Sequence, residues 1–153
     1  MATTFDSLLR GQQWQNVKRN ADLQHYVREI EDLFQQAVML FAANHQFDLS
    51  CTLLFSDPRT VRCYLLNEAG YQVSRNVYAP HYQQQLNARF SPLLCGDDAN
   101  WSHKHYHYRA LKQPGFIQIS RPYLSVADSR MCITLSQTVR VSGTLYVFCC
   151  DLD

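Results

Sequence analysis

Residues 63–74 read CYLLNEAGYQVS, and this stretch predicts a β-hairpin. Residues 60–66 are rich in strand-forming types, and residues 67–70 form a four-residue turn that ends in glycine. Residues 71–78 then supply the second strand of the hairpin. This pairing places a β-sheet near the middle of the chain, and the other segments are arranged around it.

The chain after the hairpin predicts a helical crossover followed by three more strands. Pro80 starts a short helix that continues to about Arg89, and residues 90–100 form an irregular loop. Residues 101–112 run from a loop into a second helix, which Pro114 and the following glycine end. The later strands and the turns between them follow in order: 116–126, a turn at 127–129, 131–140, a turn at 142–143, and 144–152.

The N-terminal third is predicted to be helical. Asp6 or Ser7 caps a short first helix, and Asn20 precedes a long amphipathic helix. The apolar side chains of the long helix recur at steps of three and four residues and form one stripe: Leu23, Tyr26, Val27, Ile30, Leu33, Phe34, Ala37, Val38 and Phe41. Two interpretations of the stripe remain open. It packs on the chain's own sheet, or its heptad-like spacing also forms a homodimer seam with a second copy.

Together these elements predict an α+β fold, with a five-stranded antiparallel sheet and a long N-terminal helix. The length of 153 residues fits a single domain. Within residues 1–153, we expect residues 1–46 to form the helical segment and residues 47–153 to form the α/β core.

Composition excludes some classes of partner and leaves the compartment open. The net charge is +1 and the basic residues are scattered, so nucleic acid is not an expected partner. No signal peptide is seen, and no apolar run approaches the ~20 residues that span a bilayer. Six cysteines without a CxxC pair suit reduced thiols, which predicts a cytoplasmic protein. The alternative is an excised extracytoplasmic domain of a membrane receptor.

Four segments, taken in this order, resemble the Cache (PDC) sensor domain, a PAS-like family. They are CYLLNEAGYQVS at 63–74, WSHKHY at 101–106, GFIQISRPYLS at 115–125 and GTLYVFCCD at 143–151. The resemblance is closest to the form found in bacterial EAL and GGDEF cyclic-di-GMP signalling proteins. It covers about residues 50–153, with the long helix in the place the family expects.

The resemblance implies a ligand pocket on the sheet, roofed by the segment between the second and third strands. In amino-acid-binding members, an Arg and an aromatic residue hold the ligand's carboxylate, and their places fall on Lys104 and Tyr106. A Tyr and an Asp hold the amine, and their places fall on Tyr123 and Asp151. Lys104 lacks the bidentate fork of Arg, and His105 replaces a Pro. The ligand class therefore stays open between an amino acid and another small anion.

We expect a small-ligand-binding sensory or regulatory domain of bacterial signal transduction, with an effector domain beyond the C-terminus. The predicted pocket residues are Tyr64, Trp101, Lys104, Tyr106, Arg121, Tyr123 and Asp151. The alternative function is a ligand-free structural or dimerisation domain with a degenerate pocket. Under that alternative the same aromatic residues are ordinary core side chains.

Two further groups of residues were weighed as chemical sites. His103, His105 and His107 would share one face of a strand, but on a helix they diverge by about 200°. We predict no metal and no cofactor. Cys95 with a nearby His lacks a nucleophile elbow, a phosphate loop or paired carboxylates around it, so no catalytic residue and no enzyme activity are predicted. Cys149 and Cys150 should point to opposite faces of a strand, one in the core and one peripheral.

Overall fold

The computed structural model describes residues 28–83, 100, 104–125 and 131–153. The chain divides into two compact units, residues 1–32 and residues 33–153, and the fold described below belongs to the second. Several predictions lie outside the described residues: the first short helix, the start of the long helix, the end of the helix after Pro80, the loop with Cys95, residues Trp101 and His103, and the turn at 127–129.

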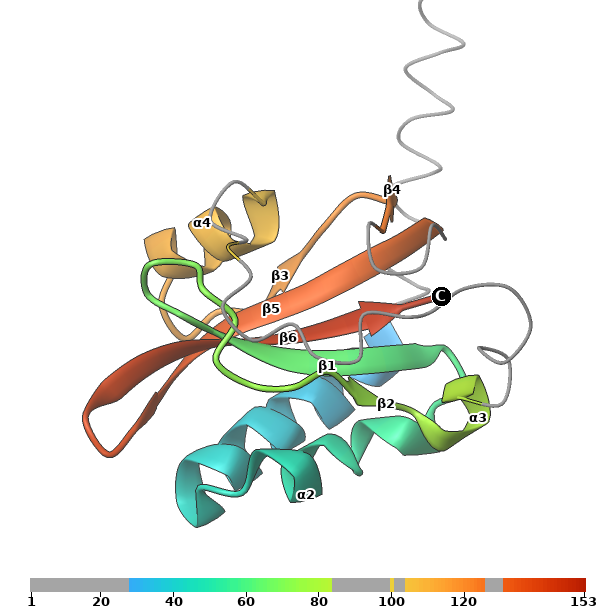
Figure 1. Ribbon diagram of the computed structural model, residues 1–153, viewed down its shortest axis with the longest axis horizontal. Coiled ribbons are helices and arrows are strands. Elements are labelled where there is room, and N and C mark those ends of the chain that lie inside the picture. The colour runs from blue at the N-terminus through green and yellow to red at the C-terminus, as the bar shows by residue number, and fades with distance from the viewer. Residues whose placement is uncertain (1–27, 84–99, 101–103, 126–130) are drawn as a thin grey trace, which may run out of the picture. The chain divides into compact units, whose positions relative to one another are not determined.

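The second unit is built on one antiparallel sheet, drawn in Figure 1. Its order is β2-β1-β6-β5-β3, and β4 pairs separately with β5. The strands are β1 (Thr60–Asn67), β2 (Val77–Tyr78), β3 (Gln118–Ile119), β4 (Tyr123–Leu124), β5 (Met131–Val141) and β6 (Thr144–Leu152). The predicted antiparallel sheet is confirmed, with one difference in the strand expected at 116–126. That strand is split in two because Pro122 has no N–H to donate to the ladder.

The hairpin also differs from its prediction. The turn forms as expected, with Gly70 at a φ of 92° and its N–H donating to the Asn67 carbonyl over 3.0 Å. The prediction of a second strand over residues 71–78 is wrong for the middle of that segment. After a single bridge between Leu66 and Gln72, it leaves the ladder until β2. A side chain replaces a backbone partner here, because the Leu65 N–H donates to the Ser74 hydroxyl over 2.8 Å.

Helices cover both faces of the sheet. A helix over residues 28–44, α2 (Phe47–Cys51) and a 3₁₀ turn at Leu54–Ser56 precede β1. From residue 33 onward the first helix lies with α2 on one face, and α4 (His105–Lys112) lies on the other, as Figure 1 shows. The short α3 (Pro80–Gln83) follows β2. None of the helices in the part of the chain described here is long and apolar enough to span a membrane.

The apolar stripe of the first helix packs on the chain's own sheet over residues 33–41. Phe34 is fully buried, and its ring meets the Phe148 ring edge-on with centroids 5.5 Å apart. Phe41 contacts the same ring at 6.0 Å. The first interpretation of the stripe is confirmed for this part of the helix. A homodimer through the helix stays a prediction.

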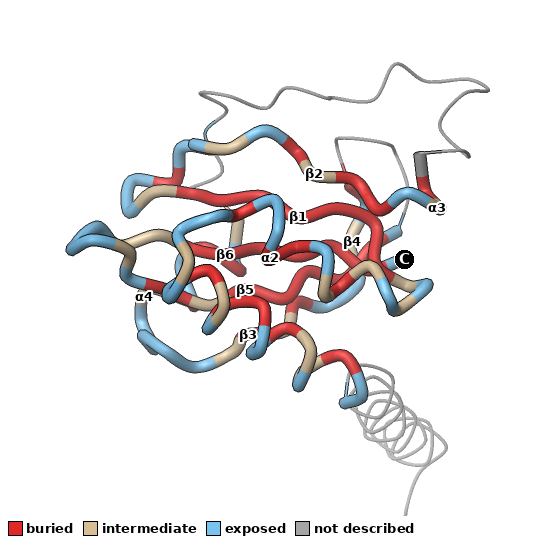
Figure 2. The backbone as a smooth tube through the Cα atoms, turned by 90° about the horizontal axis from the view of Figure 1, so that it is seen from below, coloured by how far each residue is buried: buried red, intermediate tan, exposed pale blue. Residues whose placement is uncertain are grey.

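Strand alternation gives the sheet two chemically different faces. On β5, Ile133 and Leu135 point to the face covered by the first helix and α2, called the helix side below. Thr134 and Ser136 point to the opposite face, covered by α4 and called the α4 side, and all four residues are buried. Figure 2 shows buried positions running along the central strands. Cys149 and Cys150 do occupy opposite faces, but both are fully buried, so the expected peripheral position was wrong. The reason is that the central β6 is covered on both sides.

Candidate functional site

The α4 side of the sheet carries a row of polar side chains across four strands. Arg62 on β1 lies opposite Tyr78 on β2 and opposite Asp151 on β6. Asp151 in turn lies opposite Thr134 on β5. In an antiparallel sheet, residues directly opposite each other point to the same face, so the ladder itself brings these groups together.

A buried ion pair forms the centre of this row. The Arg62 Nε donates to Asp151 Oδ2 over 2.6 Å, and the two residues are 3% and 1% exposed. The guanidinium carbon also lies 4.7 Å from the centre of the Tyr64 ring. Burial by itself would lower the pKa of Arg62, but the charge of Asp151, the hydrogen bond to it and the neighbouring tyrosines together outweigh burial and raise that pKa well above its ordinary value. The guanidinium therefore keeps its positive charge in this buried position.

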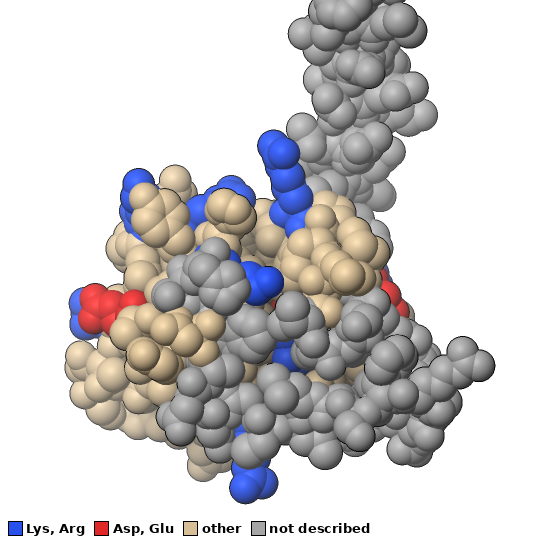
Figure 3. All heavy atoms as spheres, turned by 45° about the horizontal axis from the view of Figure 1, so that its top comes forward, with Lys and Arg blue, Asp and Glu red and all other residues tan. Residues whose placement is uncertain are grey.

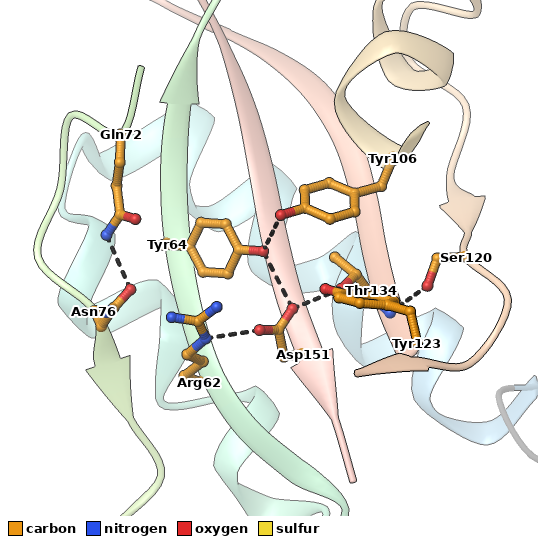
Figure 4. A network of polar contacts seen from close by, with 9 residues as sticks. All are labelled: Arg62, Tyr64, Gln72, Asn76, Tyr106, Ser120, Tyr123, Thr134 and Asp151. Carbon is orange, nitrogen blue, oxygen red and sulfur yellow. Dashed lines mark hydrogen bonds and ion pairs between the residues drawn. The ribbon is translucent and has the colours of Figure 1, made fainter. Parts of the chain in front are cut away.

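Two chains of hydroxyl groups converge on the other oxygen of Asp151, as Figure 4 shows. Thr134 Oγ1 donates to Asp151 Oδ1 over 2.7 Å, and the Tyr64 hydroxyl lies 3.2 Å from the same oxygen. Each hydroxyl has one proton. Donation by Tyr64 to Asp151 therefore leaves Tyr64 to accept from Tyr106, whose hydroxyl is 2.9 Å away. By the same reasoning, the Tyr123 hydroxyl donates to Thr134.

The tyrosines of this network stay protonated. The pKa values of Tyr64, Tyr106 and Tyr123 are all raised, mainly because burial disfavours the phenolate. The negative charge of Asp151 raises all three pKa values further. The three tyrosines thus form a fixed chain of hydroxyl groups around one carboxylate. None of the three titrates near neutral pH.

Aromatic rings and a lysine form the rim of the site. The Tyr123 ring, half-buried, stacks on the Tyr106 ring with centroids 6.1 Å apart. Lys104 is the N-cap residue of α4, and its Nζ lies 5.3 Å from the centre of the Tyr123 ring. Lys104 and Tyr123 are both partly exposed, whereas Tyr64 and Asp151 beneath them are not. Among the described residues of this site, Lys104 and Tyr123 are therefore the ones that solvent reaches.

Most of the residues predicted for the pocket gather here. Tyr64, Tyr106, Tyr123 and Asp151 belong to one hydrogen-bond network, and Lys104 lies at its rim. Arg121 is exposed, in the segment between β3 and β4. Trp101 lies outside the described residues. The structure thus brings five of the seven predicted residues together, and the role of all seven in binding stays a prediction.

Sequence reasoning missed Arg62 and Thr134. A signal for Arg62 was present, because it stands between Val61 and Cys63 in a predicted strand and alternates onto the same face as Tyr64. A cation at such a position needs a buried partner. Thr134 carried no comparable signal, because threonine is an ordinary strand residue.

The other chemical groups that were considered do not assemble into a site in the described residues. His105 is exposed, while His107 is buried with its Nε2 3.1 Å from the Asn67 carbonyl oxygen. No group of three His, Cys, Asp or Glu side chains has a metal-binding arrangement there. On the helix side of the sheet, Cys63 and Cys150 are opposite one another and fully buried. Burial raises the pKa of both thiols well above its ordinary value, which makes them unreactive.

Known structures with a similar fold include ligand-binding domains of bacterial chemoreceptors and an EAL-domain protein. The ligand-binding domain of the Campylobacter jejuni chemoreceptor Tlp3, in complex with 4-methylisoleucine, is 18% identical with a TM-score of 0.52 over 95% of this chain. That of the Pseudomonas fluorescens chemoreceptor CtaA with L-valine is 15% identical with a TM-score of 0.56 over 86%. The Bacillus subtilis YkuI protein, with an EAL domain in complex with c-di-GMP and calcium, is 20% identical with a TM-score of 0.56 over 98%.

These similarities establish the fold. The chain has the Cache-type, PAS-like α+β fold of chemoreceptor ligand-binding domains, as its sequence motifs predicted. It spans 56% of the Tlp3 chain, 54% of the CtaA chain and 38% of the YkuI chain, and so corresponds to part of each. No protein-family model and no curated protein sequence matches it.

Proposed function

We propose that this chain is a small-ligand-binding sensory domain of bacterial signal transduction, and that its ligand binds on the α4 side of the sheet. The ligand is a small anionic or zwitterionic metabolite. The observation that carries the proposal is the buried network around Asp151, in which Arg62, Tyr64 and Thr134 hold one carboxylate. Burying two charges and several hydroxyls is unfavourable for stability compared with an apolar core, so such a network is more typical of a recognition site than of a structural core.

The rim provides the first contacts for the ligand. Lys104 supplies a positive charge beside the stacked rings of Tyr106 and Tyr123, which suits a ligand with an acidic group and an apolar portion. The network below fixes the positions of the aromatic rings that the ligand contacts. We assign Trp101 and Arg121 to the same ligand from their motif positions.

The neighbours of known structure support this reading. Two of them were solved with a branched-chain amino acid or an analogue bound, in domains of the same fold. The link to cyclic-di-GMP signalling is supported by a single neighbour, the EAL-domain protein YkuI. We extend the proposal to a longer signalling protein in which β6, carrying Asp151, transmits ligand binding to an effector domain, and in which the first helix contacts a second copy.

We propose binding and not catalysis. The thiols nearest the network offer no nucleophile, because burial raises the pKa of Cys149 well above its ordinary value. Its side chain is fully buried among Tyr64, Tyr106 and Val147. The tyrosines are protonated and their hydroxyl protons are used within the network, so none of them serves as a base.

A thermal-shift screen of carboxylates, amino acids and nucleotides tests the proposal, followed by calorimetry on the compounds that stabilise. Ligand binding raises the melting temperature, and the rise grows with the logarithm of the ligand concentration relative to its Kd. Lys104→Gln should weaken the binding of the stabilising compound, raising its Kd by about tenfold, which is the loss expected for one charge-assisted contact. Lys112→Gln, at the other end of α4 beside Tyr108, is the matched control and should leave binding unchanged. A wild-type protein that no compound stabilises would overturn the proposal.

One observation favours a second candidate, a ligand-free structural or dimerisation domain. The polar groups of the network bond mostly to one another, as a sealed core would require. Under this candidate the domain has a stable oligomeric state and responds to no compound. Sedimentation of the wild-type protein with and without the screened compounds separates the two candidates.

A further inference from the structure

The charge of Asp151 is already balanced inside the protein. Arg62 Nε holds Oδ2 at 2.6 Å, while the hydroxyls of Thr134 and Tyr64 donate to Oδ1. The remaining lone pair of the carboxylate lies on Oδ2, the oxygen that Arg62 holds. An ammonium group there would stand beside the guanidinium, and this contact between like charges is unfavourable.

The guanidinium itself has an unused donor. Arg62 Nη1 is buried and has no hydrogen-bond partner among the described residues. The stack of the guanidinium on the Tyr64 ring, at 4.7 Å, and the bond from Nε fix the plane of the group. A buried donor without an acceptor is rare in native proteins and favours a ligand oxygen at that position.

The chain above the site is also basic. Residues 104–125 contain Lys104, Arg109, Lys112 and Arg121 and no Asp or Glu. Figure 3 shows Lys and Arg atoms more prominently than Asp and Glu atoms on the described part of this face. Beyond the pair of Arg62 and Asp151, the cation that the structure places nearest the stacked rings is Lys104, which favours an anion over an ammonium.

We propose that the site selects a small carboxylate that has no ammonium group, and that Arg62 Nη1 is the donor that binds it. This inference rests on the proposed function and narrows its ligand from anionic or zwitterionic to anionic. Lys104 at the rim attracts the carboxylate, and Arg62 at the floor of the site binds it. Nη1 is closed to solvent, so the side chains that cover it move when the ligand enters.

The test compares amino acids with their amine-free counterparts by calorimetry on the full chain. The pairs are valine with isovalerate, alanine with lactate and with pyruvate, and aspartate with succinate. In wild-type protein we expect at least one amine-free acid to bind about tenfold or more tightly than its amino acid. Equal or tighter binding of every amino acid would overturn this inference and leave the proposed function standing. Absence of binding by any compound would overturn the proposed function and this inference with it.

Variants then assign the preference to Arg62. Arg62→Lys keeps the charge without the Nη1 donor. It should raise the Kd of the preferred carboxylate about tenfold. Arg62→Gln paired with Asp151→Asn keeps a hydrogen bond without charges, which protects folding, and should remove the preference altogether. Circular dichroism checks that both are folded. Arg109→Gln, an exposed arginine of α4, is the control and should bind as wild type does. A preference that survives in both Arg62 variants would overturn the assignment.

Discussion

The two faces of the sheet use the same strands for different purposes. On the helix side, alternate positions place Phe148 against Phe34, Phe41 and Phe47 in a cluster of edge-to-face rings. On the α4 side, Asp151, three residues further along β6, is held by a cation and hydroxyls. The first face gains stability from buried apolar area. The second buries charges, whose desolvation roughly cancels their attraction, so it contributes specificity more than stability.

The largest effect should come from the apolar face. Phe148→Ala removes a ring that three other rings contact and leaves a cavity, so the free energy of unfolding should fall by about 4 kcal/mol. Urea denaturation followed by circular dichroism measures it. Phe116→Ala, at a side chain 69% exposed, is the matched control and should change stability by less than about 0.5 kcal/mol. Similar losses in both variants would mean that the helix-side face is not the principal core.

The polar face should respond differently to single and double substitutions. Asp151→Leu leaves the Arg62 cation buried without its counter-charge, and should lower the free energy of unfolding by about 3 kcal/mol. Combining it with Arg62→Met removes both charges and should restore stability to within about 1 kcal/mol of wild type or above it. The same denaturation measurements apply. A double variant as unstable as the single one would show that the ion pair itself stabilises the fold.

The contrast between the faces also explains what sequence reasoning recovered. The helix stripe and the strand alternation follow from apolar periodicity, and they predicted the sheet, the split of Cys149 from Cys150, and the packing of Phe34. The middle of the second hairpin strand was missed because Ser74 binds the Leu65 N–H with its side chain, and periodicity does not report such a bond.

The candidate site was recovered in part for a related reason. Motif resemblance located Tyr106, Tyr123 and Asp151, which the structure joins in one network. It did not locate Arg62, because Arg62 stands just before the segment at 63–74 and its place in the network is defined by its register opposite Asp151. Strand register depends on the whole sheet and cannot be read from a single segment.

A smaller effect is expected from the hydroxyl chain. Tyr64→Phe removes the group that links Tyr106 to Asp151, leaving a buried acceptor with one donor fewer. The free energy of unfolding should fall by about 1–2 kcal/mol, as for other buried hydrogen bonds. Tyr71→Phe, on a side chain 44% exposed, is the control and should have almost no effect. An unchanged stability in Tyr64→Phe would show that water replaces the hydroxyl and that this face is open to solvent.

The smallest effect concerns the ion pair of Arg59 and Asp57, which is more exposed than the pair on the α4 face. The Arg59 Nη2 lies 2.6 Å from Asp57 Oδ2, and the side chains are 22% and 11% exposed. Hydrogen bonding from Arg59 lowers the pKa of Asp57 below 3.8. A lowered folded-state pKa means that the stabilisation is present above 3.8 and is lost as the pH falls through the folded value.

For a partly exposed pair this stabilisation should be below about 1 kcal/mol. Asp57→Asn should therefore destabilise slightly at about pH 6, and the difference from wild type should vanish well below the folded pKa of Asp57. Urea denaturation at the two pH values measures it, with 0.5 M salt as a second condition in which the difference at pH 6 should shrink. A difference that persists in acid would mean that Asp57 acts through its bond to the Arg59 backbone N–H, over 2.9 Å, and not through its charge. The charge of this pair would then contribute no measurable stability.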